Sequence, residues 1–133
     1  MNFNHPVVPL VARLLMSYVY LTSGLGKLVD WRGNAAYMDH HHLPMIPVLL
    51  ATAAFVELAG SLCLVSGYQA RWAAFVMFGY TAVLTLLLHN YWAYIGDLAG
   101  VQETHFRKNL AIMGGLLMVS YGGPGRWAIG KIA

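Results

Sequence analysis

Two sets of polar residues lie within or at the ends of long apolar stretches, where ionisable groups are costly and often functional. The first set is a pair of opposite charges, Arg13 and Glu57. The second set is rich in hydrogen-bonding groups and consists of Lys27, His89, Asn90, His105, Lys108 and Asn109. Lysine and asparagine side chains donate hydrogen bonds, and histidine donates or accepts them. These residue types are suited to holding a small polar group at membrane depth.

Arg13 and Glu57 are expected to lie within reach of each other. At a rise of about 1.5 Å per residue, Arg13 lies roughly 9 Å from one membrane face and Glu57 roughly 15 Å from the same face. A pair between them would compensate two charges that hydrocarbon does not tolerate singly. We therefore predict an intramembrane ion pair between Arg13 and Glu57. It either fixes the register of two helices or serves as a proton relay, with Glu57 neutral in a substrate cavity.

The second set is expected to gather at the opposite membrane face. His105, Lys108 and Asn109 follow i, i+3, i+4 spacing, which places them on one face of a helix. Lys27 follows Tyr20 by seven residues, on a face that turns inward. Such a site offers donors to the carbonyl oxygens of a quinone head group, whose tail would lie in lipid. The alternative interpretation is that these residues are solvated helix ends and caps.

The histidine and cysteine content does not favour a metal centre. The run of residues 40–42 holds three adjacent histidines, which cannot all point at one ion from a regular element. His89 and His105 lack acidic or cysteine partners at ligand spacing. A single cysteine, Cys63, excludes a dithiol mechanism within the chain. We expect no metal and no intrinsic cofactor, with a quinone as the one cofactor that the pattern suggests; the role of residues 40–42 stays open.

The composition identifies the elements that position these residues. The 133 residues are 59% hydrophobic and only 10% charged, and a soluble core of this length cannot bury that much apolar surface. The net charge of +3 is scattered and gives no footprint for nucleic acid. Four stretches approach the roughly 20 residues that a membrane helix needs, namely residues 7–27, 44–67, 71–92 and 106–122. We predict an all-α integral membrane protein, a single transmembrane domain over residues 1–133 folded as a four-helix antiparallel bundle.

Short motifs then point to a known family. They are Ser23–Lys27 (SGLGK), Ala35–Met38 (AAYM), Glu57–Gly60 (ELAG), His89–Trp92 (HNYW), Phe106–Leu110 (FRKNL), Gly114–Leu117 (GGLL) and Gly123–Arg126 (GPGR). In this order and spacing the chain resembles the DoxX family of small bacterial inner-membrane proteins, from about Arg13 to Arg126. The resemblance implies four transmembrane helices in the bacterial inner (plasma) membrane, with both termini cytoplasmic. The balance of positive charges at the two ends also favours cytoplasmic termini.

The resemblance also suggests a functional context. The family takes its name from a subunit associated with thiosulfate:quinone oxidoreductase, and some members resemble partners in membrane redox complexes. Our first hypothesis is a membrane subunit of a quinone-linked oxidoreductase system. The second is a non-catalytic structural or accessory subunit of a larger membrane complex, and the third is a small-molecule carrier. The expected partners are the lipid bilayer and either other membrane subunits or further copies of the chain. The sequence leaves open whether the chain is itself an enzyme.

Overall fold

The computed structural model describes residues 5–130, and these residues form helices and loops without a strand. The elements are α1 (Val7–Val29), α2 (Trp31–His40), α3 (Ile46–Ser66), α4 (Ala70–Leu88), the single 3-10 turn η1 (Tyr91–Ala93) and α5 (Asp97–Gly122). The predicted all-α class is confirmed. The predicted single domain also includes residues 1–4 and 131–133, which lie outside the described residues.

The helix boundaries follow from local sequence. Pro47 occupies the first turn of α3, where a missing N–H costs nothing. Gly67 closes α3 with a φ of +79°, a left-handed conformation that glycine adopts without strain. The short turn after Gly67 sends α4 back antiparallel to α3. Two predictions were wrong at this level: the connection after residue 27 contains a further helix, α2, and the last helix begins at Asp97 rather than at residue 106.

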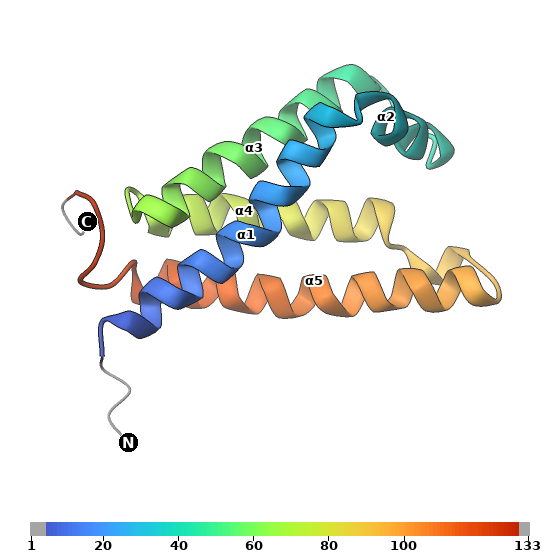
Figure 1. The fold of residues 1–133 in the computed structure, drawn as a ribbon. Coiled ribbons are helices and arrows are strands. Elements are labelled where there is room, and N and C mark those ends of the chain that lie inside the picture. Colours follow the sequence, from blue (N-terminus) through green and yellow to red (C-terminus); the bar gives the residue numbers. More distant parts are fainter. Residues whose placement is uncertain (1–4, 131–133) are drawn as a thin grey trace.

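The long helices form two pairs that diverge (Figure 1). Helix α1 packs mainly against α3, and α4 packs mainly against α5, with α3 and α4 also in contact. The two pairs lie close together near the chain termini and spread apart toward α2, and α2 and η1 lie at the open end. The buried core therefore lies nearer the termini and includes Tyr20, Leu64, Met77 and Leu116. Polar side chains take the space between the pairs at the open end.

Glycine sets the closest approach between α3 and α4. A Cβ atom on Gly60 would come within 2.4 Å of Met77 Sδ, so a larger residue here would force the Met77 side chain to move or the two helices to separate. Met77 itself is almost fully buried. Gly60 of the ELAG motif therefore serves helix packing, because the missing side chain leaves room for the Met77 thioether between α3 and α4.

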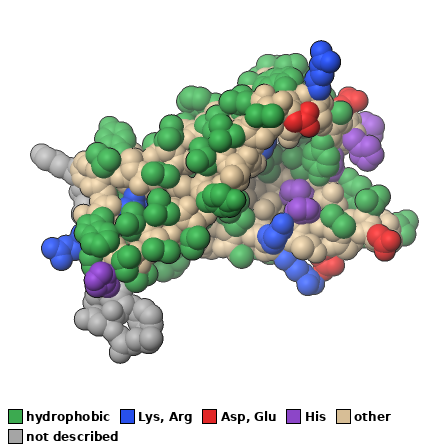
Figure 2. Space-filling view, in the orientation of Figure 1, with side chains coloured by type: hydrophobic (Ala, Val, Ile, Leu, Met, Phe, Trp, Pro, Cys, Tyr) green, Lys and Arg blue, Asp and Glu red, His purple; other side chains and the backbone are tan. Residues whose placement is uncertain are grey.

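Three segments are long and apolar enough to cross a membrane: Val7–Val29, Ile46–Ser66 and Ala70–Ala93. Large apolar side chains cover much of the outer surface (Figure 2), and Leu15, Phe55 and Trp72 are each about two-thirds exposed. Lipid is the environment that such a surface requires. Helix α5 does not meet the same criterion, because every stretch of membrane-spanning length within it includes His105, Arg107, Lys108 and Asn109. The four-helix transmembrane bundle is therefore not confirmed, and three helices have the length and composition of membrane spans.

Candidate functional site

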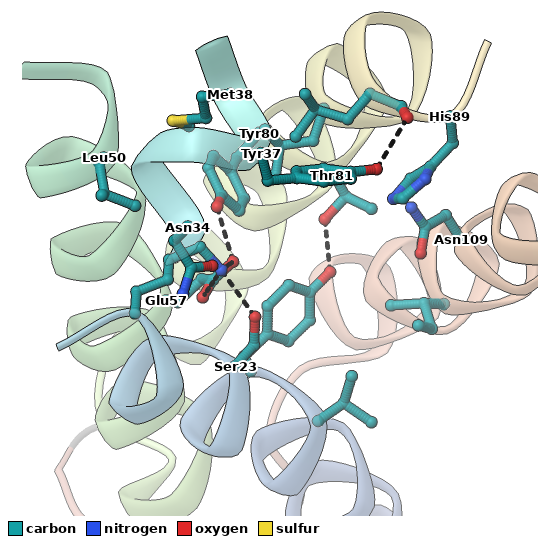
Figure 3. A pocket seen from close by; sticks show the side chains of 16 residues that line it. Ser23, Asn34, Tyr37, Met38, Leu50, Glu57, Tyr80, Thr81, His89 and Asn109 are labelled. Carbon is teal, nitrogen blue, oxygen red and sulfur yellow. Dashed lines mark hydrogen bonds and ion pairs between the residues drawn. The ribbon is translucent and has the colours of Figure 1, made fainter. Parts of the chain in front are cut away.

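A cavity of about 220 Å³ lies between the diverging helix pairs (Figure 3). Its polar lining comes from α1, α2, α3, α4, His89 and α5. These polar residues are Tyr20, Ser23, Lys27, Asn34, Tyr37, Glu57, Tyr80, Thr81, His89 and Asn109. Apolar side chains, among them Met38, Leu50 and Ile112, complete the walls. The cavity is thus a polar space enclosed by helices that face lipid on their outer sides.

Glu57 is the centre of the most densely bonded cluster. Lys27 Nζ lies 2.8 Å from Glu57 Oε2 and 3.0 Å from Oε1. Tyr80 Oη donates to Oε1 at 2.6 Å, and Lys27 also donates to Ser23 Oγ at 2.8 Å. The Glu57 side chain is only 3% exposed. Three donated hydrogen bonds and a counter-charge compensate the carboxylate for the water it has lost.

The backbone of α1 comes close to α3 at the level of this cluster. A Cβ atom on Gly24 would lie 2.9 Å from Leu58 Cγ and 3.2 Å from Glu57 Cβ. Ser23 and Lys27 are four residues apart and share the face of α1 beside Gly24. The SGLGK motif therefore combines a close helix contact with Lys27, which binds the carboxylate, and with Ser23, which accepts a hydrogen bond from Lys27.

The predicted ion pair between Arg13 and Glu57 was wrong. The fully buried Arg13 side chain donates from Nη1 to the carbonyls of Leu64 and Val65, at 2.8 and 3.0 Å, and from Nη2 to the carbonyl of Trp127. The last carbonyls of a helix are unpaired and carry partial negative charge, so they attract a cation. Arg13 thus joins α1, the end of α3 and the C-terminal segment.

Side-chain direction explains this difference. Helical side chains tilt toward the N-terminus of their own helix. Lys27 near the end of α1 therefore tilts back toward mid-membrane, whereas Arg13 near the start tilts away from it. Glu57 on the antiparallel α3 tilts toward the Lys27 end. The depth of a residue along its helix axis alone therefore does not show whether Glu57 pairs with Arg13 or with Lys27.

A second polar group lies across the cavity from Glu57. Asn109 Nδ2 donates to Thr85 Oγ1 at 2.9 Å, and Tyr20 Oη forms a hydrogen bond with Thr81 Oγ1. His89 and Asn109 lie together on this side, while Ser23, Asn34 and Glu57 lie on the other (Figure 3). Thr81 lies between these two sides, so hydrogen-bonding groups line the cavity from one side to the other (Figure 3).

Only part of the predicted ligand set lines this cavity. Lys27, His89 and Asn109 do, but Asn90, His105 and Lys108 are not among its lining residues. The His105 ring stacks on the His89 ring with centroids 5.1 Å apart. The Lys108 side chain is exposed, because it lies about 100° around α5 from Asn109. Asn90 precedes η1, and its buried Oδ1 has no hydrogen-bond partner among the described residues.

Sequence reasoning missed several lining residues, notably Ser23, Tyr80 and Thr81. The available signal was the polar spacing of α4, where Thr81 and Thr85 are four residues apart in a stretch without charges. Thr81 and Thr85 are both buried. The α2 residues Asn34 and Tyr37 could not be placed without the helix that carries them.

The three adjacent histidines lie beside the open end of the cavity. The half-buried His41 ring packs 4.8 Å from the Tyr37 ring and 6.1 Å from the Tyr94 ring, measured between centroids. Burial, and then the neighbouring His40, His89 and His42, lower the pKa of His41 below its ordinary value. Within residues 5–130, no three His, Cys, Asp or Glu side chains are placed to share a metal ion. His41 is thus a packing residue between α2 and Tyr94.

The fold and the cavity define a helical integral membrane protein with a polar site enclosed among its helices. The chain belongs to the DoxX family, whose family model matches residues 8–90. That match includes Lys27, Glu57, Tyr80 and His89, and it ends before α5. The resemblance inferred from the short motifs is therefore confirmed.

Three curated proteins illustrate what the chain is similar to. The inner membrane protein YqjF of Escherichia coli is 33% identical over 125 residues, which are 92% of this chain and 89% of that protein. The inner membrane protein YphA of Escherichia coli is 32% identical over 121 residues, or 90% and 86% of the two chains. The ER-derived vesicles protein ERV29 of Saccharomyces cerevisiae is 29% identical over 74 residues, 56% of this chain and 24% of that protein. No solved structure matches the chain.

Proposed function

We propose that this protein is a membrane subunit of a quinone-linked oxidoreductase system and that its cavity binds the quinone head group. The observation that carries the proposal is the presence of hydrogen-bonding groups on two facing sides of one cavity among the membrane helices. A quinone ring carries carbonyl oxygens at opposite edges, so each oxygen would face one of these sides. The outer surface faces lipid, which is where a quinone tail resides.

The hydrogen-bonding capacity on each side fits such a ring. Lys27 already directs its ammonium at Glu57 and at the Ser23 oxygen, which leaves the Ser23 hydroxyl proton as a donor. On the other side, Asn109 uses one amide N–H on Thr85 and keeps a second. Each quinone oxygen would thus meet one neutral donor.

The remaining groups are suited to proton exchange rather than to holding the ring. When His89 Nδ1–H donates to Gln102 Oε1 at 2.8 Å, its Nε2 is an acceptor for a hydroxyl. Tyr80 and Lys27 hold Glu57 in one orientation at the opposite side. A bound quinone would supply two-electron, two-proton chemistry, while the chain binds and orients the ring and offers these acceptors. The electron-transferring group would belong to a partner subunit.

Loss of either neutral donor should weaken quinone binding. Ser23→Ala and Asn109→Leu should each raise the Kd of a decyl-tailed ubiquinone analogue about threefold to tenfold, the range expected for one net hydrogen bond. Binding is measured by calorimetric titration of the purified protein in detergent. Lys108→Ala is the matched control at the same end of α5 and should bind like the wild type. Equal affinity across all four proteins would remove the quinone site and leave the structural-subunit hypothesis in its place.

We further propose that α5 is a fourth membrane span and that both termini are cytoplasmic. The membrane would be the bacterial inner membrane, because the similar proteins YqjF and YphA are named as inner membrane proteins. Helix α5 packs along α4, and its residues Leu116 and Val119 join the buried core. Its polar first turns would then project beyond the membrane face that carries α2.

Cysteine accessibility tests this topology. In a Cys63→Ser background, Gly100→Cys should react with a membrane-impermeant maleimide in intact spheroplasts. Arg126→Cys should react only after the membrane is permeabilised. Both positions are exposed, so accessibility reports the side of the membrane. Labelling of both cysteines from one side would show that α5 does not cross, and exchanged sides would overturn the cytoplasmic placement of the termini.

A further inference from the structure

The two ends of the molecule differ in charge. The five acidic residues of the chain are Asp30, Asp39, Glu57, Asp97 and Glu103. Four of them belong to the end that carries α2 and the start of α5, and Glu57 is paired with Lys27 inside the protein. On the face seen in Figure 2, acidic side chains gather at that end, away from the chain termini. The end that carries the termini is therefore cationic and has no acidic residue in its sequence.

Arg71 is a cation at this end that the fold holds in place while most of its hydrogen-bonding capacity stays unused. It is the second residue of α4, and its Nη1 donates to the carbonyl of Tyr121 at 2.9 Å. Its Nε is buried and has no partner among the described residues. The guanidinium lies over Gly123, where a Cβ atom would come within 3.0 Å of Nε and Nη2. A guanidinium has five N–H donors, so Arg71 can still bind an anion.

An apolar groove of about 520 Å³ adjoins this guanidinium. It is lined by Arg71, Trp72, Phe75 and Ser120. Trp72 and Phe75 are 68% and 54% exposed, which is unfavourable in water and favourable against hydrocarbon. Tyr68 lies in the turn between α3 and α4, and Trp127 follows the end of α5. Both rings are exposed, and aromatic rings at such positions are typical of the headgroup level of a membrane. A cationic head position and an apolar wall thus lie side by side at the membrane surface.

We propose that Arg71 and this groove bind one anionic phospholipid, with the guanidinium on the phosphate and an acyl chain along Trp72 and Phe75. An anionic lipid is favoured over a zwitterionic one because no carboxylate among the described residues neutralises Arg71. A free phosphate would use the guanidinium but not the groove. The site lies outside the quinone cavity, so the two proposals stand or fall separately.

Native mass spectrometry of the detergent-solubilised protein tests the lipid site. The probe is an equimolar mixture of phosphatidylglycerol and phosphatidylcholine with identical palmitoyl-oleoyl chains. The wild type should favour phosphatidylglycerol about fivefold, as expected for one cation near the headgroup. Arg71→Gln should bring the ratio close to one, and Arg71→Lys should keep a preference. Phe75→Ala, which leaves the guanidinium in place, should weaken the binding of both lipids.

Arg126→Gln is the matched control, because Arg126 is an exposed cation at the same end. It should retain the wild-type ratio, and excess inorganic phosphate should not displace the lipid. An unchanged ratio in Arg71→Gln, or an equal loss in Arg126→Gln, would overturn the site in favour of general electrostatic attraction. Displacement by inorganic phosphate alone would overturn the lipid assignment.

Discussion

Replacing Lys27 by methionine should lower the free energy of unfolding by about 3–5 kcal/mol, the cost of leaving one buried charge without its partner. Glu57 is 3% exposed and receives hydrogen bonds from Lys27 and Tyr80. Without the ammonium, the carboxylate keeps a single donor, Tyr80, in a space that water cannot fully hydrate. Unfolding in mixed micelles with increasing dodecyl sulfate, followed by circular dichroism, measures the loss.

The double mutant Lys27→Met, Glu57→Leu identifies the origin of this effect. Replacing both partners by apolar residues should cost much less than the sum of the two single changes, because no charge is then left alone. Lys108→Met removes an exposed lysine at the same end and should change stability by no more than about 0.5 kcal/mol. Additive single-mutant effects would contradict the ion pair.

Arg13→Met should cost at least about 3 kcal/mol, because it removes a charged donor from three backbone carbonyls, each worth about 1.5–3 kcal/mol. Two of these carbonyls end α3, and the third belongs to Trp127 in the C-terminal segment. We therefore expect the C-terminal segment to become sensitive to protease in this variant, in addition to the loss of stability. Arg126→Met, an exposed change in the same segment, should show neither effect.

Arg13 and Glu57 should not be coupled, in contrast to Lys27 and Glu57. The stability losses of Arg13→Met and Glu57→Leu should add within about 0.5 kcal/mol, as expected for groups with no shared partner. The same unfolding assay on the double mutant measures the coupling. A coupling above about 1 kcal/mol would restore the pairing that the sequence first suggested.

Much of the fold could be predicted because hydrophobic length specifies membrane helices directly. The starts and ends of α1, α3 and α4 lie within a few residues of the predicted stretches. Helix α2 could not be predicted this way, because it is short and polar and depends on a local cap from Asp30 to the Gly33 N–H. The first turns of α5 were missed because they lack the apolar pattern of a span.

The sequence predicted several of the polar residues that form the candidate site, but it did not predict which of them pair with each other. Polar residue types at membrane depth identified Lys27, Glu57, His89 and Asn109, because hydrocarbon makes every such residue conspicuous. Their partners depend on side-chain tilt and on the angle between the two helix pairs. Hydropathy does not report either quantity. Tyr80 and Thr81 were overlooked because tyrosine and threonine are unremarkable in an apolar helix until a cavity lies beside them.

Photoaffinity labelling with an azidoquinone tests the central claim most directly, because it locates the ring without assuming a reaction. The purified protein is illuminated with the probe, digested, and the labelled peptides are sequenced by mass spectrometry. We predict adducts in the peptides that contain Ser23–Tyr37 and Tyr80–His89, and their suppression by unlabelled quinone. Adducts confined to lipid-facing positions such as Phe55 and Trp72, unaffected by unlabelled quinone, would contradict a quinone site between the helix pairs.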